Sequence, residues 1–237
     1  MKTAVLFDLG NTLVEYYSRA RLYEILELAN REVHARLREH GSLRVTWDIA
    51  WERVRGENGE QPDFHVVPLI DRLSRVFELE QSDLSPDLAN ELCRCWLRPI
   101  FACARRYDDS LPVLQELRQN DYRTAIVSNT PWGSPGELWR EEMRRLGLAG
   151  EVDEVVFCTD VGWRKPARQI FEYAMGKLGV GPDECVFVGD DPRWDIAGPE
   201  AIGMDAILID RSGAAQNSGE NAIRNLRELV SVLSALT

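Results

Sequence analysis

Five short runs of aliphatic and β-branched residues constrain the fold of this chain more than any other feature. They occupy residues 3–7, 124–128, 154–158, 185–189 and 206–209, and a polar or glycine-containing turn follows each of them. Because the runs are apolar at consecutive positions, we expect strands that are covered on both faces. Strands of this kind are typical of a parallel sheet between two layers of helices.

Helical periodicity accompanies these strands in the later part of the chain. Apolar residues recur at helical spacing in residues 110–119, 136–146 and 167–178, in a shorter segment from near residue 196, and in a final segment at about 221–236. This alternation of strands and helices predicts a doubly wound, Rossmann-like α/β core with a parallel sheet.

More than a hundred residues separate the first strand from the second, and they contain no convincing strand. Helical patterns recur there instead, in residues 21–41, 47–54, 66–77 and 84–97. We therefore predict a catalytic core of residues 1–16 and 104–237 and a helical cap domain of residues 17–103. An insert at this place would lie over the carboxyl ends of the strands, where open α/β sheets bind ligands. It is either a lid over that site or a helical addition that only stabilises the fold.

The composition excludes several classes of protein. A formal net charge of -11 argues against nucleic-acid binding, which requires clustered Lys and Arg. No apolar run reaches the ~18 residues of a membrane helix, and the chain shows neither a signal peptide nor a Cys-x-x-Cys pair. Cys93 and Cys95 would point to different faces of a helix, which argues against a metal pair. We expect a reduced, cytoplasmic protein that binds no membrane; its oligomeric state is left open.

Polar residues follow the first four strands at their carboxyl ends. A single aspartate after a strand is most simply a turn or helix-capping residue. The carboxyl ends of parallel strands, however, meet at one edge of the sheet, so their side chains can converge on one crevice. The polar sets are Asp8, then Ser128-Asn129-Thr130, then Arg164-Lys165-Pro166, then Gly189-Asp190-Asp191 with Asp195 shortly after.

These residue types suit phosphoryl transfer. Asp8 supplies a carboxylate nucleophile, but two anions repel, so the attack on phosphate requires a metal ion and a cationic side chain to screen the pair. Asp190 and Lys165 would fill those two needs, with Mg²⁺ as the metal. The phosphate oxygens would be held by Ser128 and by backbone N–H groups around Gly10 and Asn129.

The order of these motifs resembles that of the haloacid dehalogenase (HAD) superfamily of hydrolases. The resemblance is carried by Asp8 with Thr12, by Ser128, by Lys165-Pro166 and by the segment GDDPRWD, and it covers almost the whole predicted core. It implies a Rossmann-like core with a mobile helical cap, an aspartyl-phosphate intermediate and Mg²⁺ as cofactor in most members.

The resemblance also implies roles for individual residues. Asp8 would be the nucleophile, Ser128 would bind phosphate and Lys165 would stabilise the charged intermediate. The metal would be bound by Asp8 itself, by Asp190, by the backbone carbonyl of Gly10, and by Asp195 or, as the second choice, Asp191.

Gly10 departs from the family pattern. Phosphatases of the family usually have a second aspartate there, which protonates the leaving group and later deprotonates the attacking water. Glycine can do neither, although its carbonyl can still bind a metal ion. General acid–base catalysis is worth ~10² to 10⁴ in rate, so we expect a slowed or specialised enzyme rather than an abolished one.

The sequence thus predicts a Mg²⁺-dependent phosphatase that acts on a small phosphorylated metabolite. Two alternatives stay open. A binding or regulatory protein would retain the site without turnover, and Gly10 favours it. A haloacid dehalogenase would have an aromatic residue in place of Gly10 and no need for the acidic cluster. The substrate is not identified, because the sequence does not tell which cap residues, Tyr16 and Tyr17 among them, face the site.

Overall fold

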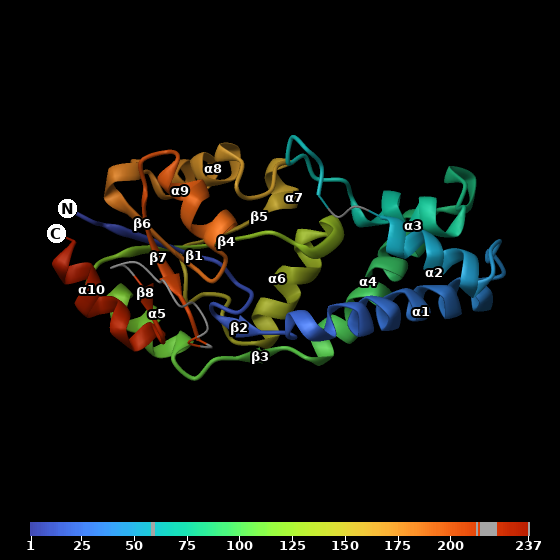
Figure 1. Ribbon diagram of the computed structural model, residues 1–237, viewed down its shortest axis with the longest axis horizontal. Helices are drawn as coiled ribbons and strands as arrows, with labels where there is room; N and C mark the ends of the chain where they lie inside the picture. The colour runs from blue at the N-terminus through green and yellow to red at the C-terminus, as the bar shows by residue number, and fades with distance from the viewer. Residues whose placement is uncertain (58–59, 212, 214–221, 237) are drawn as a thin grey trace.

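A six-stranded parallel sheet forms the centre of the protein, with strand order β5-β4-β1-β6-β7-β8. The computed structural model describes residues 1–57, 60–211, 213 and 222–236. Helices cover both faces of the sheet (Figure 1), which confirms the predicted doubly wound α/β class. The strands are β1 (Ala4–Phe7), β4 (Arg123–Ser128), β5 (Glu154–Phe157), β6 (Cys185–Gly189), β7 (Asp205–Ile209) and β8 (Ala222–Ile223).

Alternate residues of β1 enter two different apolar cores. Val5 and Phe7 pack in the core that includes α5 (Ser110–Gln119) and α10 (Leu229–Ala235). Ala4 and Leu6 point to the opposite face, where α8 (Arg168–Leu178) covers the sheet (Figure 1). All four strand residues are fully buried, so the strand is apolar at every position because both of its faces are covered.

Register brings the ends of the central strands to one edge. Phe7 lies opposite Ile126 of β4 and opposite Val188 of β6, in parallel pairing on both sides. The residues that follow these three strands therefore lie together at the carboxyl edge. The other core helices are α6 (Gly136–Arg145), α7 (Cys158–Val161), α9 (Gly198–Glu200) and the π-helical segment η5 (Pro192–Ala197).

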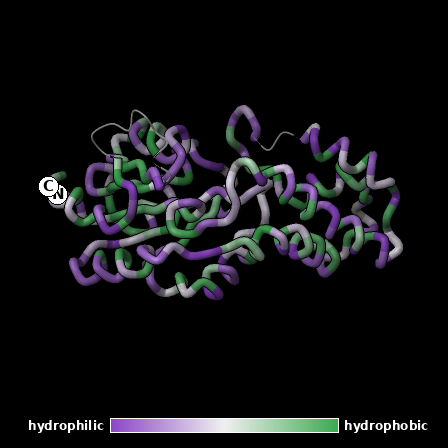
Figure 2. Tube along the Cα trace, turned by 60° about the horizontal axis from the view of Figure 1, so that its bottom comes forward, coloured by the Kyte–Doolittle hydropathy of each residue, from purple (hydrophilic) through white to green (hydrophobic). Residues whose placement is uncertain are grey.

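Four helices of the predicted insert lie beside the sheet, on the right in Figure 1. They are α1 (Leu22–His40), α2 (Trp47–Gly56), α3 (Leu69–Phe77) and α4 (Pro86–Ala102), and α1 packs along α4. Green and purple segments alternate along these helices in Figure 2, as expected for helices with one buried face. Within the described ranges, no helix is long and apolar enough to cross a membrane. The boundaries at residues 16 and 104 stay a prediction.

Local signals explain where the insert helices begin and end. Ser85 caps α4 by accepting a hydrogen bond from the Leu88 N–H at 3.2 Å, and Pro86 occupies the first turn. Gly41 ends α1 with a left-handed φ of 80°, a conformation that costs glycine little.

The short 3₁₀ turns are η1 (Arg19–Arg21), η2 (Gln81–Asp83), η3 (Pro131–Gly133), η4 (Pro182–Glu184) and η6 (Leu226–Glu228).

A two-stranded ribbon that the sequence did not predict joins the two ends of the insert. β2 (Val14–Glu15) pairs antiparallel with β3 (Arg105–Arg106), and Val14 lies opposite Arg106. The expectation that no strand lies between the first and second core strands is therefore wrong at these four residues. Strands of two residues carry no periodicity, so only their pairing defines them.

The predicted final helix over residues 221–236 begins later than expected. Residue 221 lies outside the described residues, and Ala222 instead pairs with Leu208 of β7 as the start of β8. The helical segment starts at η6, where the Asn225 side chain caps it by accepting from the Arg227 N–H at 3.1 Å. Pairing with the edge of the sheet thus takes precedence over the helical pattern.

Candidate active site

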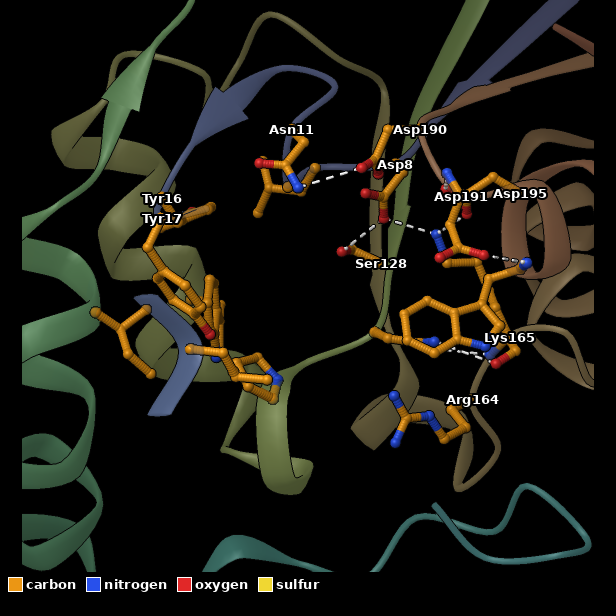
Figure 3. Close-up of a pocket in the computed structure, with 18 residues that line it drawn as sticks. Asp8, Asn11, Tyr16, Tyr17, Ser128, Arg164, Lys165, Asp190, Asp191 and Asp195 are labelled. Carbon is orange, nitrogen blue, oxygen red and sulfur yellow. Dashed lines mark hydrogen bonds and ion pairs between the residues drawn. The ribbon is translucent and has the colours of Figure 1, made fainter. Parts of the chain in front are cut away.

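A cavity of about 460 Å³ opens at the carboxyl edge of the sheet, and the residues predicted for catalysis, phosphate binding and metal binding line it. Asp8 follows β1, Ser128 ends β4 and Asp190 follows β6. Lys165 precedes α8 and Asp195 lies within η5. Figure 3 shows these side chains pointing toward one another from five different segments, so the structure brings together residues that are far apart in sequence.

Lys165 is at the centre of the site. Its ammonium Nζ lies 2.6 Å from Asp8 Oδ1 and 2.6 Å from Asp195 Oδ1, and the residue is only 1% exposed. Ser128 Oγ donates a further hydrogen bond to Asp8 Oδ1 at 3.0 Å. Burial alone would lower the pKa of Lys165, but Asp195 and Asp8 outweigh it and raise that pKa, so the ammonium stays charged.

Asn129 fixes the backbone that carries this lysine. The Lys165 N–H donates to Asn129 Oδ1 at 2.8 Å, and Asn129 Nδ2 donates to the Lys165 carbonyl at 3.1 Å. Asn129 directly follows β4, so this reciprocal pair fixes the backbone of Lys165, and with it the ammonium, relative to the end of that strand. Because the side chain of Asn129 is engaged in this way, the predicted contact of this residue with phosphate would be made by its backbone N–H. That contact stays a prediction.

Three carboxylates face that single ammonium. Oxygen atoms of Asp8, Asp190 and Asp195 all lie within 4.8 Å of one another. Burial, and then the charge of Asp8, raises the pKa of Asp190 to about 6. Burial also raises the pKa of Asp195, to about 7, against the opposing effect of Lys165, whose ammonium lies 2.6 Å from Asp195 Oδ1. An excess of negative charge on hard oxygen ligands suits Mg²⁺.

This chain is similar in sequence to known proteins. Residues 2–203 match the haloacid dehalogenase-like hydrolases. The chain belongs to this family. A ribulose-1,5-bisphosphate 5-phosphatase of Halopiger xanaduensis is 27% identical over 99% of this chain and 100% of its own length. A glyceraldehyde 3-phosphate phosphatase of Methanothermobacter thermautotrophicus is 30% identical over 88% of this chain and 86% of its own.

A solved structure extends the likeness to the whole molecule. The 2-haloacid dehalogenase of Pseudomonas syringae pv. Tomato is 26% identical, and the match covers 100% of both chains with a TM-score of 0.75. The predicted resemblance to HAD hydrolases is therefore confirmed, as is the prediction of a hydrolase of this family. The relatives include both phosphatases and a dehalogenase, so the family does not by itself fix the reaction.

The two acidic residues that the sequence could not separate have different environments in this HAD hydrolase. Asp191 Oδ1 accepts hydrogen bonds from the backbone N–H groups of Arg193 and Trp194, at 2.9 and 3.2 Å, and so caps η5. This cap explains why the segment begins before the predicted start near residue 196. The side chain of Asp195 instead reaches the acidic cluster, where a Cβ on Gly189 would overlap it.

The backbone geometry does not require a glycine at position 10. Its φ lies outside the left-handed region that favours glycine. An added Cβ would have Tyr16 Cδ2 at 3.9 Å and Asp8 Oδ2 at 4.0 Å as its nearest neighbours, which are ordinary contacts. The backbone there thus accepts other residues, and the missing carboxylate is a chemical feature of the site.

Sequence reasoning missed several residues that line the cavity. Asn11 adopts a left-handed φ of 54° and donates from Nδ2 to Asp190 Oδ2 at 3.2 Å. Asparagine tolerates this conformation, so its position directly after Gly10 was a usable signal. Tyr16 and Tyr17, which the sequence could not assign to the site, both line the cavity.

Proposed function

We propose that this protein is a Mg²⁺-dependent phosphatase that hydrolyses a small phosphorylated metabolite through an aspartyl phosphate on Asp8. The observation that carries the proposal is the buried ammonium of Lys165, held 2.6 Å from both Asp8 and Asp195, with Asp190 in the same cluster. Phosphatases among the relatives, matched over most of their length, support the same reaction.

The first step is an attack by Asp8 on phosphorus. Asp8 Oδ1 lies between the hydroxyl of Ser128 and the ammonium of Lys165, which orient the carboxylate and can bind the oxygens of an incoming phosphate. A bond forms between the carboxylate oxygen and phosphorus as the ester P–O bond breaks, and the leaving oxygen departs as an anion that takes its proton from water. Water then attacks the phosphorus of the acyl phosphate, which releases inorganic phosphate and restores the carboxylate.

The acidic cluster would hold the metal ion. Asp8, Asp190 and the backbone carbonyl of Gly10 would be ligands, and Asp195 would contribute directly or through water. Mg²⁺ supplies charge neutralisation for the nucleophile and the phosphate when it is bound. Asn11, bonded to Asp190, would keep that carboxylate turned toward the cluster.

Two features favour this reaction over the alternatives. A dehalogenase attacks carbon and uses no metal, so it would have no need for a cluster in which three carboxylates surround one ammonium. A binding protein without turnover would need no nucleophile held by both an ammonium and a hydroxyl, although Gly10 is consistent with it.

The test is phosphate release from a panel of phosphorylated metabolites, measured with Mg²⁺ and with EDTA. Asp8→Asn keeps the shape of the side chain and removes the nucleophile, so activity should be lost while thermal unfolding changes little. Asp108→Asn, at an exposed position, is the matched control and should stay active. Retained turnover in Asp8→Asn, or binding of phosphate by the wild type without any turnover, would contradict the proposal.

A further inference from the structure

The cavity above Asp8 has two unlike sides. In Figure 3 Lys165 and Arg164 lie on one side, and Tyr16 and Tyr17 lie on the other. The side of the two tyrosines is formed by apolar and aromatic residues that follow β2 or belong to the insert, to η3 and to α6. They are Tyr16, Tyr17, Leu22, Ile100, Pro131 and Trp139.

This apolar side continues beyond the first cavity. A second cavity of about 260 Å³ shares Tyr17, Leu22, Ile100 and Pro131 with it, and is also lined by a stacked pair of indole rings, Trp96 and Trp132, with centroids 5.5 Å apart. Its charged lining residues are Arg55 and Glu57, and neither of them lines the first cavity. Tyr16 and Trp139 form an edge-to-face pair at 5.5 Å. Such surfaces accept an aromatic ring with favourable geometry.

Positive charge in the first cavity is confined to the opposite side. Among the described residues that line it, the cations are Lys165 and Arg164. The Arg164 guanidinium lies 5.4 Å from the centroid of the Trp194 ring, away from the tyrosines in Figure 3. A second phosphate or carboxylate placed against Tyr16 and Trp139, in the first cavity, would lose its hydration without gaining a cationic partner on that side of the cavity, and this costs free energy.

We propose that the leaving group is an uncharged aromatic alcohol that occupies this apolar side, so that the substrate is an aryl phosphate monoester. This deepens the proposed function and rests on it. When phosphate is held by Ser128 and Lys165, the ester substituent extends toward the tyrosines. Gly10 supports the same class independently, because an aryl oxide leaves as an anion without a proton donor and takes its proton from water.

A matched pair of substrates tests the inference. Phenyl phosphate and 4-carboxyphenyl phosphate have similar leaving groups and differ by one carboxylate. We expect kcat/KM for phenyl phosphate to be larger by about 10-fold to 100-fold, as for other contacts in apolar pockets. Isothermal titration of both esters into the inactive Asp8→Asn variant should give the same order of affinity without turnover.

Leu22→Arg then places a cation on the apolar side. Leu22 is 45% exposed and lines both cavities, so the substitution should be tolerated, lower kcat/KM for phenyl phosphate and raise it for the carboxylated ester. Leu28→Arg is the control, because Leu28 lies on the same helix, is 43% exposed and lines neither cavity.

The outcomes separate the two proposals. Equal kcat/KM for the two esters, unchanged by Leu22→Arg, would overturn the inference and leave the phosphatase intact. A preference for the carboxylated ester that Arg164→Ala removes would also overturn it and assign a carboxylate site to Arg164. If neither ester is turned over while a member of the metabolite panel is, the inference is overturned and the phosphatase proposal stands. If no member of the panel is turned over either, the phosphatase proposal fails, and equal affinities in the titration would overturn the inference as well.

Discussion

Gly10→Asp restores the acid that phosphatases of this family usually carry, and the structure supports its tolerance. The nearest atoms to the new Cβ lie at 3.9 and 4.0 Å, and the backbone is not left-handed. We therefore expect the variant to fold with a melting temperature close to that of the wild type.

The magnitude follows from the position of Asp8 Oδ2, 4.0 Å from that Cβ. Two carboxylates about 5 Å apart repel by about 3 kcal/mol at an effective dielectric constant of about 20. This repulsion raises the pKa of the new carboxyl toward neutrality, so it can carry a proton when the substrate binds. A positioned acid is worth ~10² to 10⁴ in rate. We expect a gain of about 10²-fold in kcat for alkyl phosphates and a much smaller gain for aryl phosphates.

The assay is kcat across esters of graded leaving-group pKa. The wild type should show a steep dependence and Gly10→Asp a shallow one, while Gly10→Ala, which adds the Cβ without the acid, should follow the wild type. A flat dependence in the wild type would refute the reasoning and would indicate that another group donates the proton. Thermal unfolding of each variant shows whether a lost activity reflects a lost fold.

Three further predictions concern the metal and the lysine. Asp190→Ala should raise the Mg²⁺ concentration required for activity far more than Asp191→Ala, because only the former belongs to the acidic cluster; equal effects would contradict the assignment. Protons compete with the metal for Asp190, whose pKa is raised to about 6. Below that pH, Mg²⁺ activation curves should therefore shift to higher Mg²⁺ concentrations, by up to about tenfold per pH unit. Well above it, they should be constant. A shift that appears only above pH 6 would have the wrong sign. Asn129→Ala removes two hydrogen bonds from the backbone of Lys165 and should lower the free energy of unfolding by about 1–3 kcal/mol together with kcat; an unchanged kcat would exclude a positioning role.

The sequence predicted the core of the fold because its signals there are local. β1, β4, β5, β6 and β7 are apolar on both faces, and their burial follows from that composition. The ribbon of β2 and β3 and the pairing of Ala222 with Leu208 depend on contacts between distant segments, which no local pattern records. The helical pattern near residue 222 was real but weaker than pairing at the sheet edge.

The site was predictable to the level of residue type and order. Parallel register explains why Asp8 and Ser128 lie together, since both follow from where their strands end. The separate roles of Asp191 and Asp195 depend on which of them caps a helical turn, and that is decided by three-dimensional geometry. The two hydrogen bonds between the Asn129 side chain and the Lys165 backbone also join segments that sequence spacing does not relate.

The central claim is that Asp8 carries the phosphoryl group during turnover, and acid quenching tests it most directly. The wild type is mixed with a phosphorylated substrate and Mg²⁺, quenched within a turnover, digested and examined by mass spectrometry. The account predicts a phosphoryl group on the peptide that contains Asp8 and none on the same peptide of Asp8→Asn. Release of phosphate with no modification at Asp8 at any quench time, together with turnover by Asp8→Asn, would contradict it.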